Sequence, residues 1–255
     1  MRRLLSYLWK ERRLMMRLDK FLSVTGTATR KESAALLKKG RVFVDGQPVY
    51  KGETKIDEEV STVTLDGTPI LFQKNRYILV HKPAGYVSST DDPSGPTVLE
   101  LLPEKERRGL FPCGRLDKNT TGLIILTDDG PLSHRLLAPK SHVTKEYLFT
   151  CARPVTLKDL LDLEGGVDIG GYVTKPCKIT LFDEFSGRIA VTEGKYHQIK
   201  LMFAARCNKI VRLHRERFGG ILLDGTLKEG DFRPLTAEEV ALLKNQTTTT
   251  KEETK

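Results

Sequence analysis

The positive charge of this 255-residue chain is confined to its beginning. Lysine and arginine number 42, and aspartate and glutamate 33, so the net charge is 42 − 33 = +9. Residues 1–52 hold 13 basic and 4 acidic side chains (13 − 4 = +9), whereas residues 53–255 hold 29 of each (29 − 29 = 0). A basic module joined to a neutral body is typical of a protein that grips a polyanion with one part and does other work with the rest. The sequence therefore predicts two structural parts.

Composition excludes several classes of protein. Hydrophobic residues make up 39% of the chain, enough to bury a core, and no apolar run approaches the roughly 18 residues of a membrane helix. The four cysteines are far apart and form no CxxC pair, which indicates free thiols in a reducing compartment and neither zinc nor disulfides. We expect a cytoplasmic protein without a metal. The histidines do not pair at metal-ligand spacing and are interpreted as structural or surface residues: His81, His134, His142, His197 and His214.

Residues 17–65 read as two short helices followed by a small sheet. Apolar residues at helical spacing begin at Leu18, and Thr29 with Glu32 forms a capping box that opens a second helix. The turn Asp45-Gly46 follows a run of three β-formers and predicts a hairpin. Its basic residues either form a solvated helix face or bind nucleic acid, and their concentration favours the second reading. The predicted RNA contacts are Arg17, Lys20, Arg30, Lys31, Lys38 and Arg41. Residues 1–16 are an extension of unknown role.

From residue 75 the pattern changes to buried strands that alternate irregularly with helices. Aliphatic or aromatic runs predict strands at 77–80, 122–126, 147–149 and 188–191, and helices are expected to begin at Pro131, near Thr156, around Tyr196 and at Thr236. The absence of a βαβ rhythm favours an α+β fold with a mixed, largely antiparallel sheet over 75–244. The polar segment 245–255 is expected to be a disordered tail.

Two places could carry chemistry. Asp117 lies in a loop rich in glycine and threonine just before a strand of aliphatic residues, and it is either a reactive carboxylate or a turn residue that caps its own loop. Residues 195–217 carry seven basic side chains and one acid. They form either a basic helix face or a second surface for a polyanion, and the neutrality of the rest of this part favours the second interpretation. We expect Lys195 and Arg215 of this cluster to contact RNA.

Several short motifs, in this order, resemble those of the RNA pseudouridine synthases, and in particular the members that modify small-subunit rRNA. The resemblance covers roughly residues 17–244, and its first part resembles the alpha-L RNA-binding module of a small-subunit ribosomal protein and of tyrosyl-tRNA synthetases. The motifs are Lys82-Pro83-x-Gly85-Tyr86, Ser89-Thr90-Asp91-Asp92-Pro93, Gly114-Arg115-Leu116-Asp117 with Thr120 to Leu123, Lys145-Glu146-Tyr147, Glu193 to Lys200, and Leu213 to Arg217 with Gly219-Gly220.

The resemblance implies an isomerase that converts uridine to pseudouridine without a cofactor. By that resemblance Asp117 is the essential carboxylate, Tyr147 stacks on the flipped uracil, and Lys200 pairs with Asp117 and keeps it ionised. Arg115 is expected to hold a phosphate or to occupy the space that the base vacates. Asp117 adds to the substrate or removes a sugar proton, and the sequence does not choose between these routes.

The expected partner is 16S rRNA within a partially assembled small subunit, with a monomeric enzyme of the type that forms pseudouridine 516. Two alternatives stay open. One is a synthase that modifies large-subunit rRNA, because the motifs are shared with such relatives. The other is a non-catalytic RNA-binding assembly factor, against which the intact trio of Asp117, Tyr147 and Lys200 argues.

Overall fold

The computed structural model describes residues 15–58, 60–70, 72 and 75–246, and it divides into two compact units, Met1–Lys74 and Asn75–Lys255. Most of the expected extension (1–16) and tail (245–255) lies outside the described residues. Where these segments are described, the expected limits are wrong by one or two residues. Met16 belongs to the first strand and Asn245 to the last helix, because each is paired or hydrogen-bonded within its element.

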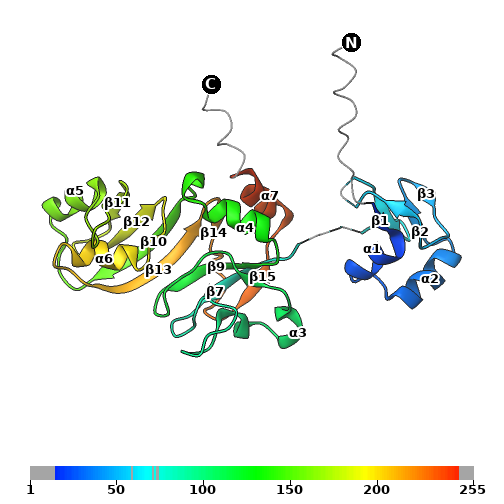
Figure 1. The fold of residues 1–255 in the computed structure, drawn as a ribbon, viewed down its shortest axis with the longest axis horizontal. Coiled ribbons are helices and arrows are strands. Elements are labelled where there is room, and N and C mark those ends of the chain that lie inside the picture. The colour runs from blue at the N-terminus through cyan, green and yellow to red at the C-terminus, as the bar shows by residue number, and fades with distance from the viewer. Residues whose placement is uncertain (1–14, 59, 71, 73–74, 247–255) are drawn as a thin grey trace, which may run out of the picture. The chain divides into compact units, whose positions relative to one another are not determined.

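The first unit has the expected two helices and small sheet (Figure 1). Helix α1 spans Leu18–Val24, and α2 spans Arg30–Lys38 with the predicted capping box between Thr29 and Glu32. Asp45 and Gly46 both have positive φ, as a tight hairpin turn requires. The strands are β1 (Met16–Arg17), β2 (Val42–Val44), β3 (Gln47–Pro48), β4 (Lys55–Ile56), β5 (Val63–Leu65) and β6 (Thr68–Pro69), with sheet order β3-β2-β5-β6 and a separate β1–β4 pair.

The second unit is built on a nine-stranded mixed sheet. Its main path runs β11-β12-β10-β13-β9-β7-β15, and every pairing is antiparallel except that of β13 with β9. The α+β fold with a largely antiparallel sheet is therefore confirmed. The strands are β7 (Tyr77–Lys82), β8 (Phe111–Pro112), β9 (Thr121–Thr127), β10 (Lys145–Cys151), β11 (Lys178–Leu181), β12 (Ser186–Val191), β13 (Ile210–Phe218), β14 (Ile221–Leu222) and β15 (Phe232–Pro234).

Helices cover this sheet on both faces (Figure 1). Three of them begin at polar caps: α4 (Gly130–Leu137) at Asp129, α5 (Leu157–Gly165) at Thr156 and α7 (Ala237–Asn245) at Thr236. The others are α3 (Glu104–Arg107), α6 (Gln198–Ala204) and two 3-10 turns, η1 (Val98–Leu101) and η2 (Pro139–Ser141). Every helix in the described ranges is too short or too polar to span a lipid bilayer.

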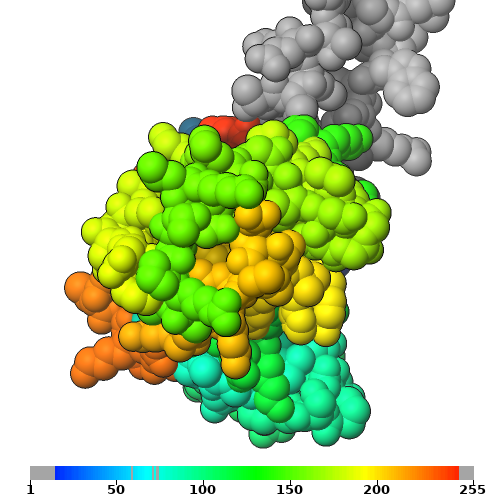
Figure 2. Space-filling view, turned by 90° about the vertical axis from the view of Figure 1, so that its left-hand side faces the viewer, coloured from blue at the N-terminus to red at the C-terminus, as the bar shows by residue number. Residues whose placement is uncertain are grey.

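Apolar residues of β7 and β9 alternate between two cores, as the period of a strand requires. Leu79 and Leu123 pack with α4 and α7, whereas Val80 and Ile124 pack with η1 and the loops around it. A third core lies under α5 and α6 at the β11–β12 end of the sheet, the end that Figure 2 faces.

The parallel junction between β9 and β13 depends on Gly122. This residue has φ +105°, and a Cβ there would lie 2.3 Å from the backbone oxygen of Arg215. Only glycine allows the two strands to approach so closely. Gly122 lies five residues after Asp117, so this close approach fixes the point at which the chain passes from the Asp117 loop into β9.

Candidate active site

The loop that carries Asp117 is held by a buried lysine. The side chain of Lys82 is 0% exposed, and its Nζ donates to the carbonyl oxygens of Pro83, Asp117, Lys118 and Thr120 at 2.8–3.2 Å. An ammonium has only three protons, so the four carbonyl oxygens share them. Burial lowers the pKa of Lys82 to about 8. The motif that begins with Lys82 therefore fixes the backbone of the motif that contains Asp117.

A second contact fixes the other side of the same loop. Ser88 Oγ donates to the carbonyl of Leu116 at 2.8 Å and accepts from its N–H at 3.0 Å. Leu116 itself is buried in the core beside η1. Asp117 thus follows a residue whose main chain and side chain are both anchored, which limits the freedom of its carboxylate.

The carboxylate of Asp117 is met by two side chains from the segment that begins α6. Lys200 Nζ lies 2.6 Å from Oδ2, and His197 Nε2 lies 3.5 Å from Oδ1. The expected pairing of Lys200 with Asp117 is present. The carboxylate does not cap its own loop, because it is the backbone oxygen of Asp117 that accepts from the Thr120 N–H. Oδ2 makes the short contact with the ammonium, and Oδ1 makes the longer contact with the imidazole.

A buried glutamate positions the segment that supplies these two side chains. Glu193 accepts from the Tyr172 hydroxyl at 2.6 Å, from the Lys175 N–H at 2.9 Å and from Gln198 Nε2 at 2.8 Å. The other end of the same amide, Gln198 Oε1, accepts from the Lys195 N–H at 2.9 Å. His197 has a left-handed backbone, with φ +50°, and this network on both sides of it keeps that conformation in place.

Tyr147 lies in β10, between two cores. Its ring packs against the cluster that contains Leu116, next to Asp117, and against the cluster that contains Ile199, next to Lys200. Tyr147 therefore lies between the two cores that hold Leu116 and Ile199, the sequence neighbours of Asp117 and Lys200. Tyr147 is half-buried, so part of the ring stays accessible.

Arg215 is not at the surface, and a direct contact with RNA does not fit its position. Its side chain is 2% exposed, and its Nε donates to the carbonyl of Leu123 at 2.7 Å. It sits 5.4 Å from the ring of Phe218, which Lys145 also approaches at 6.0 Å. Burial, with Arg215 as the next cause, lowers the pKa of Lys145 to about 8. The physical reason for the correction is that Arg215 belongs to β13, a central strand, where its side chain is covered.

The segment 195–217 is accordingly not one basic helix face. It contains α6 and most of β13, and several of its cations meet acids: Arg206 lies 3.2 Å from Asp159 and Arg217 lies 3.3 Å from Glu146. The strand β13 was missed because its arginines hide the apolar pattern of a buried strand. The exposed cations that remain are Lys195, Lys209 and Arg212.

The other predicted RNA contacts are exposed. In the first unit Arg17 pairs with Asp19 at 2.6 Å, and Arg41 pairs with Asp66. In the second unit Arg115 is exposed beside Asp117. Among the described residues of the first unit, four predicted contacts show no ion pair and are exposed: Lys20, Arg30, Lys31 and Lys38. Their contact with RNA stays a prediction.

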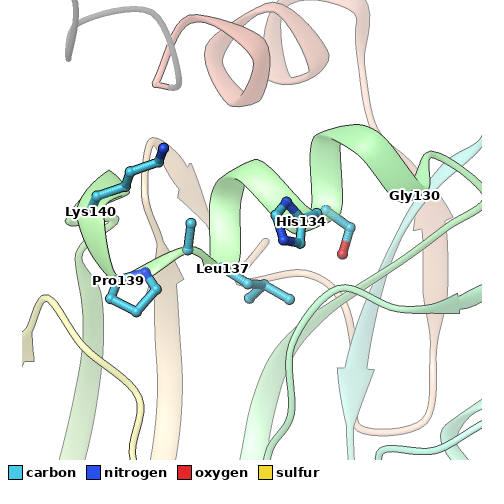
Figure 3. Close-up of a pocket in the computed structure, with 7 residues that line it drawn as sticks. Gly130, His134, Leu137, Pro139 and Lys140 are labelled. Carbon is cyan, nitrogen blue, oxygen red and sulfur yellow. The ribbon is translucent and has the colours of Figure 1, made fainter.

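A shallow pocket along α4 and η2 is separate from these groups (Figure 3). It is lined by residues that include His134, Leu137 and Lys140, and none of its lining residues belongs to the Asp117 loop or to α6. Within the described residues, no three histidine, cysteine or acidic side chains gather as metal ligands would.

The sequence analysis placed neither His197 nor Lys82 among the residues expected to form the active site. The spacing of His197 and Lys200, three residues apart at the start of a helix, was a signal that both could reach one partner. For Lys82 no local signal existed, because three of its four acceptors come from a loop 35 to 38 residues further along the chain.

Comparison with known proteins agrees with this geometry. Residues 76–205 match the family model for RNA pseudouridylate synthase, and residues 16–60 match the S4 domain. The chain is 44% identical over 234 residues to an uncharacterized RNA pseudouridine synthase, YtzG, of Bacillus subtilis, covering 89% of this chain and 98% of that protein. It is 43% identical over 229 residues to ribosomal small subunit pseudouridine synthase A of Escherichia coli K12, covering 89% and 99%.

A solved structure extends the agreement to the fold. The crystal structure of a pseudouridylate synthase has a TM-score of 0.64 and 36% sequence identity, and covers 89% of this chain and 99% of that one. With a match to the S4 domain over residues 16–60 and a match to RNA pseudouridylate synthase over residues 76–205, the chain belongs to the RNA pseudouridine synthase family.

Proposed function

We propose that this protein converts one uridine of small-subunit 16S rRNA to pseudouridine, at position 516, with Asp117 as the essential carboxylate. The observation that carries the proposal is the carboxylate of Asp117, paired with Lys200 at 2.6 Å through Oδ2 and less closely approached by His197 at Oδ1, in a loop that Lys82 and Ser88 fix. The small-subunit target rests on the similarity to ribosomal small subunit pseudouridine synthase A of Escherichia coli.

The reaction breaks one bond, rotates the base and forms another. The bond between N1 of uracil and C1′ of the ribose is cleaved, the uracil turns, and C5 bonds to C1′. The C5 proton is then lost and N1 gains a proton, so the product is an isomer of the substrate. In this chemistry Asp117 either bonds to the substrate and is released when C5 bonds to C1′, or takes a proton from the sugar and returns it after the base has turned. Lys200 keeps the carboxylate oriented during either route.

The surrounding groups support a flipped base. A uridine must leave its stack to reach a carboxylate in a loop, which costs a few kcal/mol and requires firm anchoring of the RNA backbone. Tyr147 offers a ring for the uracil, and Arg115 offers a cation for a phosphate or for the space the base leaves. The exposed cations of the S4 unit supply further backbone contacts.

The test is the replacement Asp117→Asn, which keeps the size of the side chain but removes its charge and its nucleophilic oxygen. Conversion should fall to background, while affinity for the same 16S transcript should change little or rise slightly, because a negative charge near phosphate has gone. Chemical labelling of pseudouridine and filter binding measure the two. The matched control is Asp162→Asn. Asp162 lies on α5, where it is ion-paired with Arg206, and this variant should keep full activity.

Two results would contradict this assignment. Retention of more than a few per cent of activity by the Asn variant would exclude Asp117 as the essential group. Loss of binding together with activity would instead make the loop a structural element. Either result is distinguishable from a folding defect, because thermal unfolding of both variants can be compared.

The identity of the modified rRNA is tested by a separate experiment. Pseudouridine mapping of 16S and 23S rRNA from a deletion strain should show one missing site in 16S rRNA. A missing site in 23S rRNA would favour a large-subunit synthase, and no missing site would favour a non-catalytic assembly factor. We also propose that the protein acts as a monomer in the cytoplasm, on a partially assembled small subunit.

A further inference from the structure

Two aromatic side chains are stacked next to the reactive carboxylate. The rings of Tyr196 and His197 have centroids 3.8 Å apart and lie 19° from parallel. Tyr196 is 77% exposed, the largest exposure among the aromatic side chains that the structure describes as exposed. One face of its ring is covered by the imidazole, and the rest of the side chain is open to solvent.

The inner ring of this stack contacts the reacting group. His197 Nε2 lies 3.5 Å from Asp117 Oδ1, the oxygen that Lys200 leaves open. The stack therefore leads from the carboxylate outward to solvent through two rings. It is a rigid feature, because the Glu193 and Gln198 side chains hold the main chain on both sides of His197.

The chemistry of the stack selects its occupant. A large exposed aromatic ring costs free energy in water unless something covers it, and a nucleobase is a planar group of matching shape. A base that neighbours the target uridine is joined to it by a single sugar and phosphate, so it must lie beside Asp117 when the uridine is bound there. The neighbouring cation Lys195 does not cover the tyrosine, since its Nζ sits 4.1 Å from the ring of Tyr172 instead.

We propose that the outer face of Tyr196 is a stacking platform for the nucleobase that flanks the target uridine. The inference rests on the proposed function, in which Asp117 acts on a uridine of an RNA strand. Stacking recognises any base by its planar face, so the platform contributes affinity and register more than it reads sequence. It is an RNA-binding site that differs in kind from the phosphate contacts of the basic side chains.

The experiment uses the full chain and a synthetic 16S rRNA fragment that contains the target uridine. A fluorescent base analogue, 2-aminopurine, replaces each nucleotide that flanks the uridine in turn, because its emission is quenched when it stacks. The variants are Tyr196→Ala, Tyr196→Phe, which keeps the ring, and Phe182→Ala, a control at another exposed aromatic residue of the same unit. Affinity, its salt dependence, KM and kcat are measured with the unlabelled fragment.

We expect quenching at one flanking position with the unmodified protein, with Tyr196→Phe and with Phe182→Ala. Tyr196→Ala should lose that quenching and bind about 5- to 20-fold more weakly, with a corresponding rise in KM. Its kcat should stay within about twofold, since the platform is occupied equally in the ground and transition states. The slope of log affinity against log salt should not change, because no phosphate contact is removed.

Failure of the inference and failure of the proposed function give different results. If the unmodified protein makes no pseudouridine either in the fragment or in a partially assembled small subunit, the proposed function is wrong and the platform is overturned with it. If it makes pseudouridine but Tyr196→Ala quenches and binds like the unmodified protein, the platform alone is overturned. A changed salt slope in Tyr196→Ala would also overturn the platform, because it would indicate a phosphate contact.

Discussion

At the scale of single residues, the two oxygens of Asp117 have different surroundings. Oδ2 is 2.6 Å from an ammonium, and Oδ1 is 3.5 Å from an imidazole. The short contact to Lys200 fixes Oδ2, which leaves Oδ1 as the less tightly held oxygen. In the proposed reaction Lys200 therefore acts through the orientation of Asp117, and Asp117 is the group that meets the substrate.

Replacement of Lys200 should reduce activity strongly but less completely than replacement of Asp117. Lys200→Met removes the charge that orients the carboxylate and leaves the carboxylate in place, so we expect a loss of most of the turnover with a small residual rate. Lys200→Arg keeps a cation within reach and should retain more activity than the Met variant. Single-turnover pseudouridine formation measures all three proteins. Equal rates for Lys200→Met and the unmodified protein would exclude the positioning role.

At the scale of elements, the loop that carries Asp117 connects β8 to β9, and the end of β7 holds it in place. Lys82 is the last residue of β7, and its ammonium collects carbonyls from the loop that precedes β9. Buried carbonyls that lose their donor cost about 1–3 kcal/mol each when nothing replaces it. The stability of the sheet and the geometry of the site are therefore coupled through one side chain.

Lys82→Met should destabilise the catalytic unit as well as reduce activity. We expect a loss of about 2–4 kcal/mol and a fall in Tm of roughly 5–15 °C, measured by thermal unfolding. The control is Lys105→Met on α3, an exposed lysine of the same unit, which should unfold like the unmodified protein. A Lys82→Met variant with unchanged Tm would contradict the role of the buried ammonium.

The same residue predicts a pH dependence. Burial lowers the pKa of Lys82 from 10.5 to about 8, so between these pH values the unfolded chain binds more protons than the folded one. Stability from this group therefore increases as pH rises from about 8 to 10.5, and below pH 8 the full penalty of the buried charge is present. The unfolding free energy of the unmodified protein should gain up to about 3 kcal/mol relative to Lys82→Met across this range. A constant difference in urea unfolding series at several pH values would contradict the lowered pKa.

At the scale of the whole molecule, the excess charge and the chemistry belong to different units. The first unit has its own core around Phe21 and Leu37, and the second has three cores of its own. In the first unit six cations are expected to bind RNA, and two of them, Arg17 and Arg41, are already paired with acids. This leaves Lys20, Arg30, Lys31 and Lys38 as the strongest candidates of that unit.

Removal of residues 1–74 should weaken RNA binding and leave the second unit folded. If four phosphates contact the first unit, the slope of log affinity against log salt should become shallower by about 3. Filter binding across a salt series measures the slope, and thermal unfolding checks that the second unit stays intact. An unchanged slope would move the backbone contacts to exposed cations of the second unit, among them Arg115, Lys195, Lys209 and Arg212.

The sequence by itself determined the features that depend on neighbouring residues. The sequence predicted the division into a basic part and a neutral part, the helix starts at Thr29, Thr156 and Thr236, and the turn at Asp45. These features are readable because caps and turns are set by contacts within a few residues. Asp117 was identified by its loop and by the resemblance of its motif.

Only the tertiary structure decided the features that depend on pairing across the chain. Arg215 was expected at the surface and lies inside a central strand, and His197 was expected to be a structural or surface histidine and meets Asp117. Lys82 reaches carbonyls that are remote in sequence. Strand register and loop packing place these side chains, and no local pattern encodes the register of a strand whose partners lie tens of residues away.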